Sequence, residues 1–235
     1  GLPLGLQFSI LAVGIIVMQG AVVRFDIAEN GIMVPGTPAQ NGFSAANKLI
    51  NFLMALYNGL ASAILGFNAQ NYGKSDYRRI RQGTRQSLII MLIMYAFCLT
   101  AGLLLSIGGA YQHIFMSEDK ISEASVRFGN TYLYVDFILY FILGFLIVTR
   151  SAVQGITKVG YVLGAGVAEL VSRVLICAYL PALVNGSATD ASASLASFAA
   201  VCFGDPGAWL LASLVLLVPT VRYIFRMQYK KEVSG

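Results

Sequence analysis

The sequence predicts an all-α membrane protein in which six transmembrane helices form a single bundle. Hydrophobic residues make up 57% of the 235 residues and charged residues only 11%, whereas a soluble domain has about 25% charged residues. The apolar residues gather in six long runs, some of which contain no charge. The connections between these runs are too short for a soluble domain, so we expect one transmembrane domain over residues 1–235.

The first two spans are expected at residues 4–23 and 43–68. Each is about as long as the ~20 apolar residues that a helix needs to cross a bilayer. The connection between them contains Pro35 and Pro38 with several glycines, which is typical of a turn-rich loop. The second span is rich in small residues, and we expect it to end in a polar turn at residues 69–73.

The third and fourth spans are expected at residues 88–107 and 121–148. The third contains no charged residue and is interrupted by Gly108 and Gly109. Residues 117–120, Ser-Glu-Asp-Lys, are expected to cap the fourth helix, which begins amphipathic and becomes fully apolar.

The fifth and sixth spans are expected at residues 161–184 and 206–221. The segment between them, residues 185–205, is rich in serine and alanine and is expected to be a polar loop with at most a short surface helix. A basic helical tail is expected from the sixth span to Lys231. Glycines and alanines inside the spans, Gly59, Gly160, Gly164 and Gly166 among them, are expected to allow close helix contact.

Six spans place both ends of the chain on one side, and the basic residues indicate which side. Cytoplasmic loops of membrane proteins carry an excess of lysine and arginine. The opposite side carries four basic residues, Arg24, Lys48, Lys120 and Arg127, against ten on the side of the termini. We therefore expect a multi-pass protein of the cell inner (plasma) membrane with both termini in the cytoplasm. The ten basic residues on the side of the termini are Lys74, Arg78, Arg79, Arg81, Arg85, Lys158, Arg222, Arg226, Lys230 and Lys231.

Charged residues within spans are costly and point to function. Asp136, early in the fourth span, is a candidate for binding a proton or a cation, although a tyrosine partner or a position near the interface would also explain it. Glu169 and Arg173 are four residues apart on one helix face, which favours an internal ion pair. Arg150 and Gln154 either line a cavity or reach the interface.

Uncharged polar residues mark a second candidate surface. Asn47, Asn51 and Asn58 share one face of an otherwise apolar helix, which suits a water-filled cavity better than lipid. Helix–helix hydrogen bonding is the alternative explanation. Gln19, in the first span, either bonds to a neighbouring helix or faces a solute path.

Enzyme and metal-site motifs are absent from the sequence. His113 is the single histidine, which excludes HExxH and any multi-histidine metal site, and no GxSxG, P-loop or CxxC motif occurs. Cys98, Cys177 and Cys202 lack metal-like spacing, so we expect buried free thiols. We expect no enzyme activity, no bound cofactor and no nucleic-acid partner, because the basic charge follows the topology.

Several passages of the sequence resemble the multidrug and toxic compound extrusion (MATE) family in the order in which that family has them. The "AQN-G…R-I-G" passage, where a helix meets a cytoplasmic loop, carries most of this resemblance. Glu169 and Arg173 resemble the family's eleventh helix. The other matching segments are residues 2–7 (LPLGLQ), 45–48 (AANK), 66–73 (GFNAQNYG), 78–83 (RRIRQG) and 150–155 (RSAVQG).

The resemblance implies a secondary antiporter that exports organic cations and drugs in exchange for Na⁺ or H⁺. The family fold has two six-helix lobes around a central cavity, and this chain corresponds to the C-terminal lobe. Its expected partners are membrane lipid, small organic cations and the N-terminal six-helix half. On this basis Asp136 is the expected ion-coupling residue, and the expected cavity residues are Gln19, Asn47, Asn51, Arg150 and Gln154.

The chain also departs from the family pattern. Some branches bind the coupling cation through a glutamate on the seventh helix and an aspartate on the tenth. Here the seventh helix has acids only at its outer end, and the aspartate position would fall near Leu143, about two turns from Asp136. A flippase for a lipid-linked sugar or peptidoglycan precursor, which needs a cationic cavity, is the first alternative. A non-transporting membrane scaffold or membrane enzyme subunit is the second.

Overall fold

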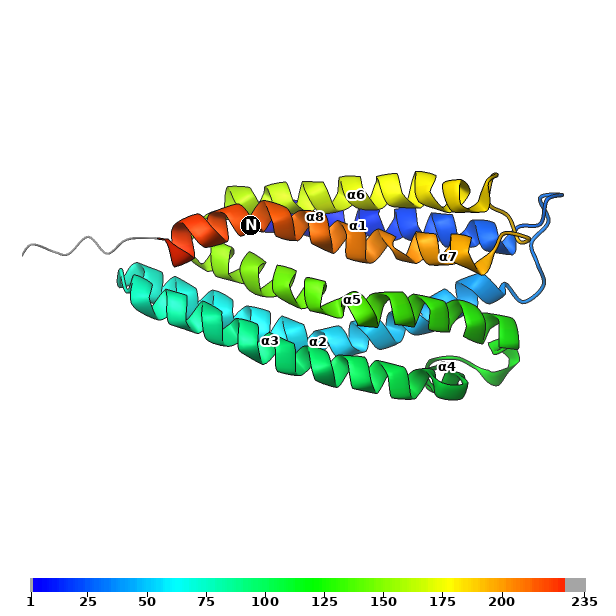
Figure 1. The fold of residues 1–235 in the computed structure, drawn as a ribbon, viewed down its shortest axis with the longest axis horizontal. Coiled ribbons are helices and arrows are strands. Elements are labelled where there is room, and N and C mark those ends of the chain that lie inside the picture. Colours follow the sequence, from blue (N-terminus) through cyan, green and yellow to red (C-terminus); the bar gives the residue numbers. More distant parts are fainter. Residues whose placement is uncertain (1, 227–235) are drawn as a thin grey trace, which may run out of the picture.

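The protein is a long bundle of antiparallel helices, as Figure 1 shows, so the predicted all-α fold class is confirmed. The computed structural model describes the backbone of residues 2–226 and the side chains of residues 12–226. Of residues 2–7 only the backbone is therefore described, and the end of the predicted basic tail, residues 227–231, lies outside the described part. The helices are α1 (Leu2–Val23), α2 (Pro38–Gly73), α3 (Tyr77–Ser106), α4 (Ala110–Phe115), α5 (Glu123–Gly155), α6 (Val159–Asn185), α7 (Leu195–Cys202) and α8 (Gly204–Pro219).

Five stretches of the described residues are long and apolar enough to cross a membrane. The helix α1, with 22 residues and no charged side chain in its sequence, makes a sixth helix of comparable length. α5 is the most deeply buried of the five stretches, and it lies at the centre of the packing. The five stretches are Pro38–Gly73, Tyr77–Phe115, Glu123–Gly155, Val159–Asn185 and Leu195–Phe225.

The helix α2 is longer than predicted at both ends. It begins at Pro38, which suits the first turn because that turn needs no N–H from it. The polar turn expected at residues 69–73 is helical instead. Asn71 within this segment and Asn68 just before it are buried. The Asn68 amide donates to the Thr84 hydroxyl at 3.2 Å, and the Asn71 amide donates to the Phe67 carbonyl at 2.7 Å. Hydrogen bonds to protein groups thus allow these polar side chains to lie inside a packed helix.

The loop expected at residues 185–205 is also wrong in its second half. Ser194 caps α7, and its side chain accepts a hydrogen bond from the Ser197 N–H at 3.2 Å. Phe198 and Val201 are fully buried, so α7 is a packed element that continues into α8 after a break at Phe203. The sixth span therefore starts near Leu195 rather than at residue 206.

The N-terminal cap of α5 also differs from the prediction. Residues 118–120 form a separate 3₁₀ turn, and Ser122 caps the helix through a reciprocal pair of hydrogen bonds with Ser125 at 2.9 and 3.1 Å. At its other end α5 continues to Gly155, beyond the expected limit at residue 148. The extra turns carry Arg150 and Gln154 into the bundle.

The helices form two groups that face each other along the bundle (Figure 1). The α2 group consists of α2, α3 and α5, and the α6 group consists of α1, α6, α7 and α8. α5 also packs against α7 and α8 and so joins the groups. Near this contact the ring of Tyr140 meets those of Tyr57 and Trp209, with centroids 5.3 and 6.1 Å apart.

The close helix contacts are not at the glycines that the sequence favoured. Gly59, Gly160, Gly164 and Gly166 have open space where a side chain would point. Instead α2 and α5 meet at Gly42, where an added Cβ would overlap the carbonyl of Ser125. Contact of two helix backbones therefore depends on which face a glycine occupies, which a run of small residues does not specify.

The expectation of buried free thiols is confirmed. Cys98, Cys177 and Cys202 are free and buried. His113 lies on the surface, with half of its side chain exposed, and its Nδ1 is 2.8 Å from the Glu118 carboxylate.

Candidate functional site

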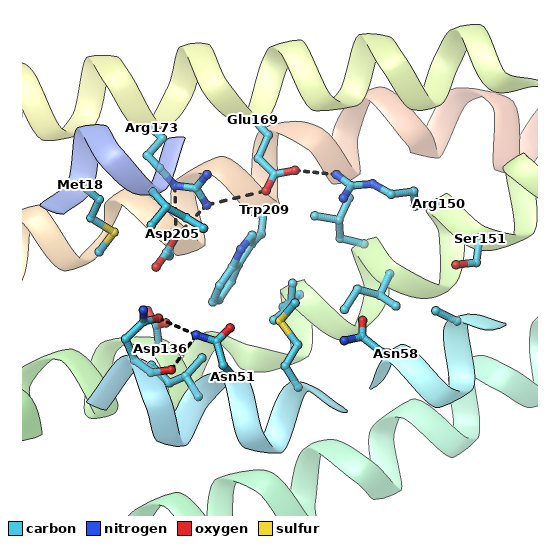
Figure 2. A pocket seen from close by; sticks show the side chains of 18 of the residues that line it. Met18, Asn51, Asn58, Asp136, Arg150, Ser151, Glu169, Arg173, Asp205 and Trp209 are labelled. Carbon is cyan, nitrogen blue, oxygen red and sulfur yellow. Dashed lines mark hydrogen bonds and ion pairs between the residues drawn. The ribbon is translucent and has the colours of Figure 1, made fainter. Parts of the chain in front are cut away.

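A cavity of about 440 Å³ lies between the two helix groups and is lined by α1, α2, α5, α6 and α8. Figure 2 shows that its walls differ in chemistry. Glu169, Arg173 and Asp205 lie on the side of the α6 group, and Asn51 and Asn58 lie on the side of α2. Apolar side chains line the cavity between these polar groups.

The α2 wall is neutral and polar. Asn47, Asn51, Asn58 and Ser62 all line the cavity, because their spacing places them on one helix face. The Asn51 amide donates to the main-chain and side-chain oxygens of Asn47 at 2.8 and 3.1 Å. This leaves the Asn51 amide oxygen available to a donor in the cavity.

The opposite wall carries four charged side chains in a continuous network. Arg173 donates to one oxygen of Asp205 from two nitrogens, at 3.1 and 2.6 Å. The same guanidinium lies 3.7 Å from Glu169, which also accepts from Arg150 at 2.5 Å. These charges are mostly buried, so their mutual pairing is what makes them tolerable in a bilayer.

Local sequence explains why this network can form. Glu169 and Arg173 follow one face of α6, one turn apart. Asp205 comes directly after the break at Phe203 and within the first turn of α8, so its side chain reaches α6 from the side. Gly14 of α1 leaves space for the Arg173 side chain, because a Cβ at this position would collide with the guanidinium.

Asp136 lies in the cavity lining and is fully buried. Neither of its carboxylate oxygens has a hydrogen-bond partner of normal length among the described residues. The Tyr132 hydroxyl lies close enough to interact with it, but its short hydrogen bond, at 2.7 Å, goes to Asp205. Arg173 attracts the Asp136 carboxylate and Asp205 repels it. A buried ionised carboxylate without donors is costly, so this group is suited to take up a cation.

Most sequence-predicted cavity residues line this one space: Asn47, Asn51, Arg150, Gln154 and Asp136. Gln19 does not. It is exposed on α1 and lies outside the cavity lining, whereas the preceding Met18 is buried and lines it. One residue along a helix turns the side chain by about 100°, which separates the two. The predicted pair Glu169–Arg173 is in contact, and it is the longest link of the network.

Sequence reasoning missed Asp205, Tyr132 and Trp209, which also line the cavity. Asp205 was assigned to a loop because the preceding segment is rich in serine and alanine. The apolar stretch of residues 195–203, LASFAAVCF, was the available signal that a buried helix begins earlier. Among the described residues, no group of three histidine, cysteine, aspartate or glutamate side chains could hold a metal ion.

Comparison with known proteins gives one match. The family model described as MatE matches residues 33–179, which is more than half of the chain. The matched region contains the α2 wall, Asp136 and the α6 charges. No curated protein sequence and no solved structure gives a significant match to this chain.

Proposed function

Because this chain belongs to the MatE family of membrane transporters, we propose that it forms the C-terminal lobe of a secondary antiporter that exports organic cations. The exchanged ion is Na⁺ or H⁺. The observation that carries the proposal is Asp136, a fully buried carboxylate that faces a cavity and has no hydrogen-bond partner among the residues that the structure describes. Such a group has a strong electrostatic preference for a cation.

The cavity suits a small organic cation. Its volume of about 440 Å³ lies within the range of typical small-molecule sites. Trp209 lines the cavity and supplies an aromatic side chain for a cationic or planar solute. Asn51 and Asn58 offer neutral hydrogen bonds that fix its orientation without adding charge.

Competition for Asp136 couples the two movements, and the gradient of the coupling ion sets their direction. An organic cation and the coupling ion each neutralise the same buried carboxylate, so binding of one weakens binding of the other. Coupled exchange follows when the two states of the transporter expose this site to opposite sides of the membrane.

We further propose the inner (plasma) membrane as the location, with both termini cytoplasmic. The basic residues of the described part gather where α2 ends and α3 and α6 begin. This distribution follows the rule that cytoplasmic ends are rich in lysine and arginine. The partner that completes the solute path would be an N-terminal six-helix half.

The alternatives have less support. A flippase for an anionic lipid-linked precursor needs free positive charge in its cavity, and both arginines that line this cavity are paired with acids. A scaffold without transport activity has no need for a polar face on α2 that lines a cavity.

Efflux from liposomes tests the proposal. The full-length protein is reconstituted with a fluorescent organic cation such as ethidium, and a Na⁺ or pH gradient is then imposed. We expect dye movement that depends on one of the two gradients. Absence of movement with either gradient, in protein that is folded and correctly inserted, would contradict the proposed function.

A further inference from the structure

The charged side chains that face α2 across the cavity belong to a network that begins and ends on α5. Tyr132 donates to Asp205, Asp205 accepts from Arg173, Arg173 contacts Glu169, and Glu169 accepts from Arg150. On a straight helix, Tyr132 and Arg150 are about 27 Å apart. Figure 2 shows the network between Asp205 and Arg150 along one side of the cavity. We call these five residues the ionic network.

Each acid of the ionic network uses its two oxygens for two different partners. Asp205 accepts from Arg173 at Oδ1 and from Tyr132 at Oδ2. Glu169 contacts Arg173 through Oε1, at 3.7 Å, and Arg150 through Oε2, at 2.5 Å. The link between Glu169 and Arg173 is therefore the loosest. A small movement of the Arg173 guanidinium makes or breaks it.

The net charge around Arg173 explains why the contact between Glu169 and Arg173 responds to the charge of Asp136. Two arginines and two acids make the ionic network neutral, and an ionised Asp136 adds one negative charge. The side chains of Glu169 and Arg173 are only 5% and 6% exposed. Water therefore screens little of the interaction, and a change of charge at Asp136, which lines the same cavity, acts on Arg173.

We propose that Arg173 and Glu169 are positioning residues that transmit the occupancy of Asp136 to Arg150. This inference rests on the proposed exchange of cations at Asp136. When Asp136 is ionised and empty, it and Asp205 both attract Arg173, and Glu169 is left to hold Arg150. When Asp136 carries the coupling ion, Arg173 is shared with Glu169, and the hold on Arg150 weakens.

Release of Arg150 acts on the solute. Arg150 lines the cavity, and its Nε has no hydrogen-bond partner among the described residues. A guanidinium that is released from Glu169 presents its positive charge to the cavity and repels an organic cation. Loading of Asp136 therefore expels the solute in two ways, by occupying its carboxylate and by freeing a repelling charge.

The groups that surround Asp136 must be included in any test that varies pH. They come from α6, α7 and α8 as well as from α5 itself. The ionisable side chains that interact with Asp136 are Tyr132 and Tyr140 of α5, Arg173 of α6, Cys202 of α7 and Asp205 of α8.

Equilibrium binding of ethidium measures this coupling. Fluorescence anisotropy of the dye is followed with the full-length protein in lipid nanodiscs. One buffer is free of Na⁺ at alkaline pH, and the others contain saturating Na⁺ or are acidic. The quantity of interest is the ratio of dissociation constants with and without the coupling ion. We expect this ratio to be about tenfold in the wild type, within the usual range of coupling between sites.

Two variants decide the question. Glu169→Gln breaks the network at its centre, and Arg150→Gln removes the repelling charge while Glu169 keeps Arg173. We expect a smaller ratio in both, about threefold, because competition for the Asp136 carboxylate remains. Glu118→Gln removes an exposed acid outside the cavity and should keep the wild-type ratio. If Glu169→Gln fails to fold, Arg150→Gln decides alone.

Each outcome has a distinct meaning. A ratio near ten in the wild type, with a loss in Glu169→Gln or Arg150→Gln, supports the role of the ionic network. A ratio near ten in all folded variants overturns it and leaves the exchange at Asp136 intact. A ratio of one in the wild type overturns both the exchange and the network.

Discussion

Two regions of the molecule each contain a fully buried aspartate, and they differ in how that aspartate is satisfied. At the junction of α1 and α2, the two carboxylate oxygens of Asp26 accept hydrogen bonds from the N–H groups of Ala39 and Gln40, at 2.9 and 2.8 Å. In the cavity, neither oxygen of Asp136 has such a partner within the described part of the chain. Burial is equal, so burial alone does not separate a structural carboxylate from a functional one.

The difference lies in which donors the fold supplies. The first turn of a helix has N–H groups without partners, and Asp26 fills this need for α2. Asp136 lies in the middle of α5, where main-chain N–H groups are already bonded within the helix. On the proposed function, its carboxylate takes a cation as its partner. Substitution at each position should affect a different property.

The largest effect is expected from Asp136→Asn. This change removes the charge that attracts both the organic cation and the coupling ion, while its size is preserved. We expect gradient-driven ethidium efflux to fall at least ~100-fold, because loss of an interaction with a buried charge is worth about 3 kcal/mol or more. Thermal stability should be retained, since no hydrogen bond is lost. Efflux at the wild-type rate would remove Asp136 from the mechanism.

The opposite pattern is expected from Asp26→Ala. Two hydrogen bonds to a charged acceptor are lost at the start of α2, which should lower the free energy of unfolding by about 2–4 kcal/mol. Efflux per folded molecule should stay near the wild-type value. Denaturant unfolding in detergent measures the loss, and Glu29→Gln, an exposed neighbour, serves as the control. Equal stability of Asp26→Ala and wild type would contradict the structural role.

A smaller effect separates a cavity-facing amide from an outward-facing one. Asn51→Ala removes a polar group from the cavity and should weaken ethidium binding by about 3–10-fold, as expected for one hydrogen bond. Gln19→Ala changes an exposed side chain outside the cavity and should leave binding unchanged. Anisotropy titrations of the two variants make the comparison. Equal weakening by both would argue that the cavity is not the binding site.

The smallest effect concerns a half-buried aspartate whose carboxylate already accepts hydrogen bonds. In the loop between α6 and α7, Asp190 accepts hydrogen bonds from the Ser192 hydroxyl and N–H at 2.6 and 2.7 Å. These bonds lower the pKa of the Asp190 carboxyl below its usual value of 3.8. Because the pKa is lower in the folded state, the stabilisation is complete above the unfolded-state pKa and is lost as pH falls through the folded-state pKa.

Ser192→Ala should therefore raise the pKa of Asp190. Carboxyl-selective NMR across the acidic range measures it. The stability difference from the wild type should be present near neutral pH and disappear in strong acid. A pKa that does not move in Ser192→Ala would contradict the assignment of the hydrogen bonds.

Much of the fold could be predicted from the sequence because it depends on properties that a single helix shows by itself. Length and apolarity identified the spans, and the charge pattern identified a common end. The spacing of Asn47 and Asn51 placed both on one face. The helix α7 was missed because serine and alanine are common in polar loops and do not by themselves indicate a buried helix. Packing against α6 buries one side of α7.

Within the ionic network, the one pair that could be predicted is the pair that a single helix holds. Glu169 and Arg173 share α6, so their spacing was informative. The partner Asp205 comes from α8, across a break whose geometry the sequence did not indicate. Gln19 was misplaced because an apolar helix gives no signal of which side faces lipid. Contacts between helices, rather than the helices themselves, limit what a sequence reveals.

The most direct test of the central claim is infrared difference spectroscopy of the reconstituted full-length protein as ethidium is added. If Asp136 exchanges the coupling ion for the organic cation, a carboxyl band should change on dye binding. The same band should be absent from Asp136→Asn, although the rest of the spectrum is preserved. An identical carboxyl change in wild type and Asp136→Asn would show that the exchange occurs elsewhere.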